Sequence, residues 1–269
     1  ELKITPKTKA IMIVHIFGLT VDVDAVLILA KKYNLRVIED AAQALGQEYK
    51  GQKCGSFGDV SIFSFYPNKQ VTTGEGGMVL TNDKNLDDRA KSLRNLCFST
   101  NRFIHKELGW NYRMTNMQAA LGVAQMERIN EIVEKKRYIG NTYNKLLKDI
   151  KEVNLPVVRT DYCENIYWVY AITLNDDYHK TVEEVMFKLG EYKIGTRPFF
   201  YPMHKQPVFN KMKLFLNDRL PSSEKLYKNG YVLIPREELM GVQKFLNKIN
   251  FLNSNADLFE FQKKQKGTA

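Results

Sequence analysis

The sequence has few cysteines and no long apolar run, and each absence excludes a class of protein. Cys54, Cys97 and Cys163 lie far apart, with spacing that fits neither a disulfide framework nor a zinc site, so we expect a reducing, cytoplasmic location and no metal. No apolar run approaches the roughly 20 residues that a membrane helix needs. The start, "ELKITPKTKAIMIVHIFG", lacks the ordered regions of a signal peptide. These absences predict a soluble protein without a membrane partner.

The sequence also has fewer acidic residues than basic ones: 30 aspartates and glutamates against 40 lysines and arginines, which gives a formal charge of +10. Such a charge would suit an anionic partner such as nucleic acid or a phosphorylated metabolite. The lysines are scattered, however, and no basic stripe with interleaved aromatic residues is present. We therefore interpret most of the charge as a solvated surface and expect no nucleic-acid partner.

The first part of the chain has the pattern of an α/β fold. Apolar runs at 10–14 and 35–40 predict buried strands, and the amphipathic segment 21–34 between them predicts a helix. This βαβ order, with continuous apolar runs, is typical of a parallel sheet covered on both faces. Two more strands are predicted at 60–65 and 77–81, and helices at 85–97 and 114–147.

We place a domain boundary near residue 150, which gives a large domain at 1–150, a smaller α+β domain at 151–253 and a polar tail at 254–269. The smaller domain is predicted to contain a strand at 167–174, a helix at 182–192, a proline-punctuated loop at 197–207 and a last helix at 239–252.

Two polar residues follow the second predicted strand. Asp40 closes that strand, and in open parallel sheets ligands bind beyond the carboxyl ends of the strands. An aspartate ahead of "AAQALG" is equally a helix N-cap, and Gln43 could face a ligand or complete a capping pattern with Asp40. The residues alone leave both interpretations open.

A hydroxyl lies near the end of the third predicted strand, and a lysine follows that strand. Ser64 lies among residues that should be buried, where a hydroxyl most often bonds a backbone carbonyl. Lys69 lies between "FSFYPN" and the glycine-rich "TTGEGG", so burial would lower its pKa and leave a nucleophilic amine able to form a Schiff base. A surface lysine is the alternative. Together, a carboxylate, a hydroxyl and an amine are the groups that hold pyridoxal phosphate.

The stretch "VIEDAAQALGQEYKGQKCGSFGDVSIFSFYPNKQVTTGEGGMVLTND" resembles the DegT/StrS-type sugar aminotransferases. The resemblance continues through "GWNYRMTNMQAALGVAQMERI" and "IGTRPFFYPMHKQP". It implies the aspartate-aminotransferase fold (fold type I), with a mostly parallel sheet, and pyridoxal 5'-phosphate as cofactor. Within the family the likeness is greatest to enzymes that aminate a GDP-4-keto-6-deoxy sugar, here GDP-4-keto-6-deoxymannose, with glutamate as the amino donor, in polysaccharide biosynthesis.

The resemblance also implies roles for residues on, or shortly after, the second and third predicted strands. Lys69 would form the Schiff base with the cofactor and move the proton during transfer, and related dehydratases have a histidine at its position. Asp40 would keep the ring nitrogen protonated, Gln43 would lie against the ring or its 3'-oxygen, and Ser64 would bond the phosphate.

Three further residues receive roles from the resemblance. Asn111 would reach the phosphate of the neighbouring subunit in a homodimer with shared active sites. Arg113 is a candidate for the donor's carboxylate. His204 would line the sugar-nucleotide pocket, although by itself it is an ordinary loop histidine.

Family members also have a segment upstream of "ITPKTKAIM" that grips the phosphate, stacks on the ring and adds strands to the sheet. The resemblance therefore implies that the fold is incomplete at its N-terminus. The alternative function is a truncated, non-catalytic homologue that cannot retain the cofactor. We expect residues 1–269 alone to be poorly soluble and nearly colourless with added pyridoxal phosphate.

Overall fold

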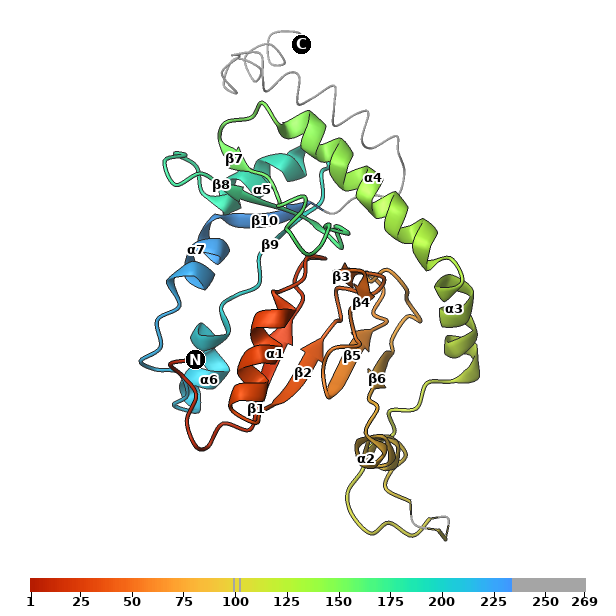
Figure 1. Ribbon diagram of the computed structural model, residues 1–269. Helices are drawn as coiled ribbons and strands as arrows, with labels where there is room; N and C mark the ends of the chain where they lie inside the picture. Colours follow the sequence, from red (N-terminus) through yellow and green to blue (C-terminus); the bar gives the residue numbers. More distant parts are fainter. Residues whose placement is uncertain (99, 102, 234–269) are drawn as a thin grey trace, which may run out of the picture. The chain divides into compact units, whose positions relative to one another are not determined.

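The computed structural model describes residues 1–98, 100–101 and 103–233, and the chain divides into two compact units (Figure 1). One comprises Glu1–Tyr138 and Val157–Trp168, and the other Ile139–Pro156 and the chain from Val169 onward. The helix predicted at 239–252 and the tail predicted at 254–269 lie outside the described residues. Within the described residues, no helix is long and apolar enough to cross a membrane.

The first unit is built on a four-stranded sheet with the order β1-β2-β5-β6. Its strands lie within the predicted ranges and are β1 (Ala10–Val14), β2 (Arg36–Asp40), β5 (Val60–Ser64) and β6 (Gly77–Leu80). The first three are parallel, and β6 is antiparallel to β5. A short hairpin of β3 (Glu48–Tyr49) and β4 (Gln52–Lys53) lies between β2 and β5 in the chain. The prediction of a mostly parallel α/β sheet is confirmed.

Helix α1 (Val23–Lys32) covers one face of β1 and β2. Asp22 begins the helix by accepting a hydrogen bond from the backbone N–H of Ala25. The buried Ala30 of α1 packs with Ile13 of β1 and Val37 of β2. The cluster is completed by five partly buried residues, Ile11, Val21, Val26, Leu27 and Leu35. The βαβ unit is therefore held by apolar burial between one helix and two strands.

The face of the sheet opposite α1 is largely uncovered in the described part of the chain, although cover on both faces was predicted. Met12 and Val14 of β1 are 58% and 40% exposed, and all four residues of β6 are exposed. The prediction of cover on both faces is wrong for the described residues. Continuous apolar sequence indicates that a strand can be buried, but it does not say which segment supplies the cover.

The predicted helix at 114–147 is two helices, α3 (Asn116–Met126) and α4 (Ile129–Leu147). Thr115 begins α3 with a capping box that it shares with Gln118. The backbone N–H of Arg128 bonds the carbonyl of Gln125, three residues back, which tightens the turn and separates the helices. Helix α2 (Lys84–Arg94) precedes them; it begins one residue earlier and ends three residues earlier than predicted.

The second unit contains an antiparallel four-stranded sheet with the order β7-β8-β10-β9. Its elements after the end of α4 are β7 (Val153–Asn154), β8 (Tyr170–Leu174), α5 (Val182–Glu191), β9 (Thr196–Pro198), the 3-10 helix η1 (Met203–Lys205), α6 (Pro207–Lys211), α7 (Pro221–Asn229) and β10 (Gly230–Leu233). The loop predicted at 197–207 is thus partly a strand and a helical turn. Pro198 is tolerated because β9 is an edge strand.

Candidate active site

Asp40 and Ser64 end two neighbouring parallel strands. Asp40 lies opposite Ile62 in the register of β2 and β5, so Ser64 lies two residues further along the adjacent strand. One carboxylate oxygen of Asp40, Oδ1, accepts a hydrogen bond of 3.0 Å from the N–H of Ala42. The residues that follow form turns and no helix, so the alternative interpretation of Asp40 as a helix N-cap is wrong. In the described part of the chain, Oδ2 accepts no hydrogen bond. Asp40 therefore caps a turn and still presents one oxygen at the edge of the sheet.

The hydroxyl of Ser64 is partly buried and accepts a hydrogen bond of 3.3 Å from the backbone N–H of Tyr66. The expected bond to a backbone carbonyl is absent among the described residues. Because Oγ acts as an acceptor, its own hydrogen remains available to a ligand oxygen.

Lys69 lies in the turn after β5, where its backbone N–H bonds the carbonyl of Tyr66 at 3.0 Å. Its side chain is half-buried, and burial lowers the pKa of the amine while the nearby charge of Asp40 partly opposes that shift. The charge of Asp40 is therefore near enough to influence the amine of Lys69. A half-buried amine of lowered pKa beside a carboxylate has the properties of a nucleophile.

Helix α3 holds the loop that follows Lys69. The amide side chain of Gln125 makes two hydrogen bonds to the backbone of Thr72: Nε2 donates to the carbonyl at 2.6 Å, and Oε1 accepts from the N–H at 3.1 Å. The Thr72 hydroxyl in turn donates to the carbonyl of Phe65 at 3.0 Å. Gly74 has φ +79°, a conformation that favours glycine. This anchoring of the turn was not foreseen from the sequence.

Gln43 lies beside the same turn. Its Oε1 accepts a hydrogen bond of 2.7 Å from the N–H of Phe17, and its carbonyl accepts one of 3.2 Å from Nε2 of Gln70. Gln70 is buried, and its Oε1 has no hydrogen-bond partner among the described residues. Gln43 thus connects the loop after β1 with the residue that follows Lys69.

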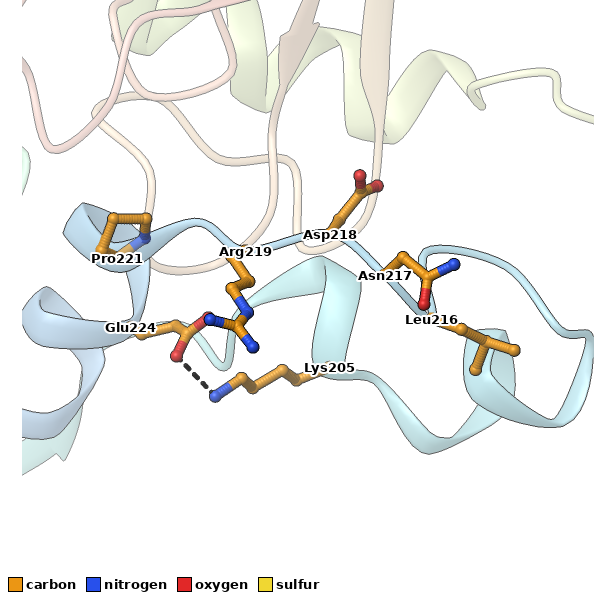
Figure 2. Close-up of a pocket in the computed structure, with 7 residues that line it drawn as sticks. All are labelled: Lys205, Leu216, Asn217, Asp218, Arg219, Pro221 and Glu224. Carbon is orange, nitrogen blue, oxygen red and sulfur yellow. Dashed lines mark hydrogen bonds and ion pairs between the residues drawn. The ribbon is translucent and has the colours of Figure 1, made fainter.

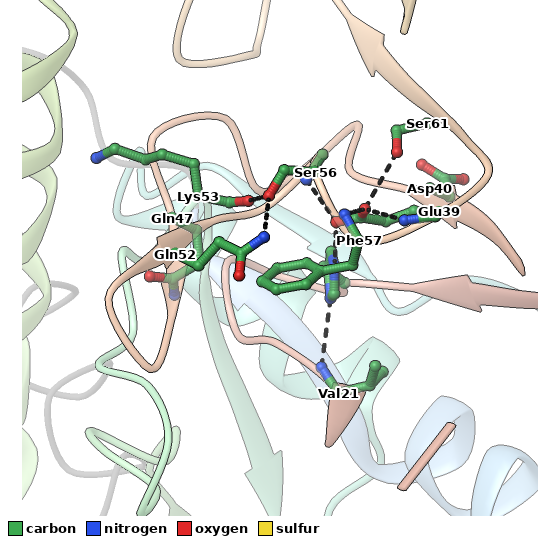
Figure 3. Close-up of polar contacts among 12 residues, drawn as sticks. Val21, Glu39, Asp40, Gln47, Gln52, Lys53, Ser56, Phe57 and Ser61 are labelled. Carbon is green, nitrogen blue, oxygen red and sulfur yellow. Dashed lines mark hydrogen bonds and ion pairs between the residues drawn. The ribbon is translucent and has the colours of Figure 1, made fainter. Parts of the chain in front are cut away.

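Directly before Asp40, the buried side chain of Glu39 is surrounded by donors, as Figure 3 shows. Its carboxylate accepts hydrogen bonds from His15 Nε2 (2.9 Å), from the hydroxyl of Ser61 (3.1 Å) and from the backbone N–H groups of Gly55, Phe57 (2.9 Å) and Gly58 (3.2 Å). Burial raises the pKa of this carboxyl, but the donors outweigh burial and lower the pKa to about 2. Glu39 therefore ties the end of β2, where Asp40 lies, to His15 after β1 and to the segment that leads into β5.

The buried cluster of His15, Glu39 and Cys54 brings three potential metal-ligand atoms within 4.8 Å of one another. Both oxygens of Glu39 already accept two or more hydrogen bonds, and Nδ1 of His15 accepts one from the N–H of Val21 at 3.4 Å. Burial also raises the pKa of the Cys54 thiol. The ligand atoms are already engaged or protonated, so the cluster is a structural network.

Trp168 is the main functional candidate that sequence reasoning missed. Its ring centroid lies 3.9 Å from Nζ of Lys69, and its indole N–H donates to the carbonyl of Asn68 at 2.8 Å. Trp168 and Lys69 are 99 positions apart in the chain, and the segment "YWVYAITL" predicted only a strand. No pattern in the sequence points to this contact.

Asn111 and Arg113 are exposed and contact each other: Nε of Arg113 donates to Oδ1 of Asn111 at 2.9 Å. Arg113 also donates to Oδ1 of Asn95 at 3.1 Å, at the end of α2. In the described part of the chain, no hydrogen bond or ion pair joins either residue to Lys69 or Asp40.

His204 belongs to the second unit, in η1. Its side chain is buried, Nε2 contacts Oε1 of Glu224 at 2.9 Å, and Nδ1 has no hydrogen-bond partner among the described residues. Glu224 also accepts a hydrogen bond of 2.6 Å from Lys205, and these donors lower its pKa to about 2. Glu224 and Lys205 line a hollow of about 620 Å³, together with Leu216, Asn217, Asp218, Arg219 and Pro221. Figure 2 shows these lining residues. His204 thus lies behind a carboxylate that faces this hollow.

Comparison with known proteins identifies relatives of the chain. Residues 1–244 match the DegT/DnrJ/EryC1/StrS aminotransferase family. A GDP-perosamine synthase of Escherichia coli O157:H7 is 42% identical over 212 residues, which cover 78% of this chain and 57% of that protein. One of Caulobacter vibrioides is 43% identical over 211 residues, with the same coverage. The chain thus spans somewhat more than half the length of these relatives.

A solved structure has a similar fold. It is Helicobacter pylori PseC, an aminotransferase involved in the biosynthesis of pseudoaminic acid, with a TM-score of 0.84 and 28% identity. The match covers 92% of this chain and 67% of that one.

Proposed function

Because the chain belongs to the DegT/DnrJ/EryC1/StrS aminotransferase family, we propose that it forms the catalytic part of a pyridoxal phosphate-dependent sugar-nucleotide aminotransferase. The observation that supports this most directly is the half-buried amine of Lys69, which follows β5, has a lowered pKa and is influenced by the charge of Asp40 at the carboxyl edge of a parallel sheet. Ligands bind at this edge in open α/β sheets.

The residues present fit pyridoxal phosphate. Asp40 presents Oδ2, which accepts no hydrogen bond among the described residues, and Ser64 has a hydroxyl hydrogen to donate. When bound, the cofactor supplies an aldehyde that condenses with amines and a ring that accepts an electron pair. Asp40 would bind the ring nitrogen and favour its protonated form, while Ser64 would donate to the phosphate.

Lys69 provides the amine for the aldehyde and afterwards a base for the substrate's proton. A neutral amine is the reactive form, and the lowered pKa of Lys69 increases the neutral fraction. Glu39 and Gln125 keep the strand end and the turn in place, so that the amine and the carboxylate of Asp40 are already oriented before ligands bind.

For the substrate we propose a nucleotide-linked 4-keto-6-deoxy sugar, with GDP-4-keto-6-deoxymannose favoured and glutamate as the amino donor. The support is the identity of 42% and 43% to two proteins named GDP-perosamine synthase. His204, behind the hollow of the second unit, is the proposed sugar-nucleotide residue of that unit, and Arg113 is proposed for the donor's carboxylate.

We also propose a homodimer in which Asn111 contacts the cofactor phosphate held by the partner subunit. Asn111 is exposed, and among the described residues it makes no hydrogen bond to Lys69. Its side chain is therefore accessible to a partner subunit across a two-fold interface.

The direct test is borohydride reduction of the cofactor-loaded protein, followed by peptide mapping. The adduct is expected on Lys69, and Lys69→Ala should remove both the adduct and turnover. Lys50→Ala is a matched control, because Lys50 also lies near an aromatic ring but is exposed and paired with Asp24. An adduct on another lysine would refute the assignment, and failure of the purified protein to take up the cofactor would favour the non-catalytic alternative.

A further inference from the structure

The indole ring of Trp168 is held in one place by its neighbours. It is 5% exposed, its N–H bonds the carbonyl of Asn68, and Phe17 stacks with it at a centroid distance of 6.4 Å and an angle of 21°. Because Asn68 directly precedes Lys69, the hydrogen bond ties the ring to the turn that carries the amine. The orientation of the indole relative to Lys69 is therefore set by the fold.

The backbone that leads to Trp168 is docked equally closely. A Cβ atom on Gly18 would lie 2.7 Å from the backbone nitrogen of Trp168 and 3.0 Å from that of Tyr167, so only glycine fits there. Nε2 of Gln47 bonds the carbonyls of both Gly18 (2.6 Å) and Glu164 (2.8 Å). A ring supported in this way cannot move aside easily, which makes it a fixed surface for a mobile lysine side chain.

The contact with Lys69 has the geometry of a cation–π interaction. Nζ lies 3.9 Å from the ring centroid, within the distance of about 6 Å at which the negative face of an aromatic ring attracts a cation. Among the described residues, Lys69 makes no side-chain hydrogen bond or ion pair, and its amine lies over the indole ring. Partial burial strengthens the attraction, because less water screens it.

We propose that Trp168 is a positioning residue whose indole face holds the ammonium form of Lys69 whenever this amine is not bonded to the cofactor. The role in turnover rests on the proposed function, whereas the contact itself does not. A free Lys69 that takes up a proton from the substrate carbon becomes an ammonium and must later release that same proton. By stabilising the ammonium, the ring keeps it near the reacting carbon, and no electrons pass through the indole.

The test isolates the ring's electrostatics from its shape. The sequence has two tryptophans, so Trp110→Phe leaves Trp168 as the only one, and fluorinated tryptophans can then be incorporated there. Each added fluorine weakens the attraction for a cation while the ring remains in place. The cofactor-free protein is labelled with trace acetic anhydride across a range of pH, and the labelling of Lys69 is measured by peptide mapping. Exposed lysines such as Lys84 serve as internal references.

The neutral fraction of Lys69 should rise with each fluorine, by roughly two- to thirty-fold over the full series, the range that such contacts cover. The references should not change, and equal melting temperatures would exclude a general loosening. Labelling of Lys69 that is independent of fluorine number would overturn the proposal. If the labelling responds but borohydride places the cofactor on another lysine, the contact stands and the proposed function fails. In the cofactor-loaded enzyme, each added fluorine on Trp168 should lower kcat with little change in KM.

Discussion

Replacement of Glu39 by glutamine should destabilise the first unit strongly, because the buried carboxylate accepts hydrogen bonds from five different residues. Its pKa lies at about 2 instead of the ordinary 4.5. A shift of this size corresponds to about 3 kcal/mol of folding free energy at neutral pH. The cost of leaving two or three donors without an acceptor gives a similar figure, about 3 to 5 kcal/mol.

The loss should be measured by urea unfolding at pH 7, or as a fall in melting temperature of roughly 6 to 20 °C. Glu48→Gln is the matched control. Glu48 pairs with Lys53 at 2.6 Å, but its side chain is 45% exposed, so its loss should cost less than about 1 kcal/mol.

The effect should depend on pH in a defined direction. Since the folded state lowers the pKa of Glu39, its contribution is complete above pH 4.5 and is lost as the pH falls through 2. The difference between wild type and Glu39→Gln should therefore fall to about 1 kcal/mol at pH 3. A difference below about 1 kcal/mol at pH 7, or one that does not shrink in acid, would refute this account of the Glu39 network.

Three further predictions concern the site and its support. Asp40→Asn should keep the turn, because its side-chain oxygen can still accept from Ala42, but lose most of the turnover; near wild-type kcat would reduce Asp40 to a cap. Gly58→Ala should cost roughly 1 to 3 kcal/mol in urea unfolding, because its Cβ would lie within 2.9 Å of two backbone carbonyls, whereas Gly190→Ala, with open space around it, should be neutral or stabilising. Mixed dimers of Lys69→Ala and Asn111→Ala chains should regain some activity, and verified heterodimers without activity would show that each site is built from one chain.

Much of the fold was predictable because its strands and helices carry local signals. The strands at 10–14, 36–40 and 60–64 are apolar runs of ordinary strand length, and α1 begins at an aspartate that caps it. The break between α3 and α4 was not predictable, since a single backbone bond from Arg128 produces it inside a pattern that favours helix throughout. The exposed faces of β1 and β6 were not predicted, because an apolar sequence does not indicate which segment will pack against it.

For the site, the sequence by itself determined the chemical groups and their local placement. Asp40 at a strand end, Ser64 on the next strand and Lys69 in a glycine-rich turn follow from spacing alone, because those residues are close in the chain. Only the tertiary structure decided what surrounds them. Trp168 lies against Lys69 although the two residues are 99 positions apart in the chain, and His15, which follows β1, bonds Glu39 in the adjacent parallel strand β2. Such contacts depend on how packed elements meet, and packing between distant segments leaves no periodic signal in the sequence.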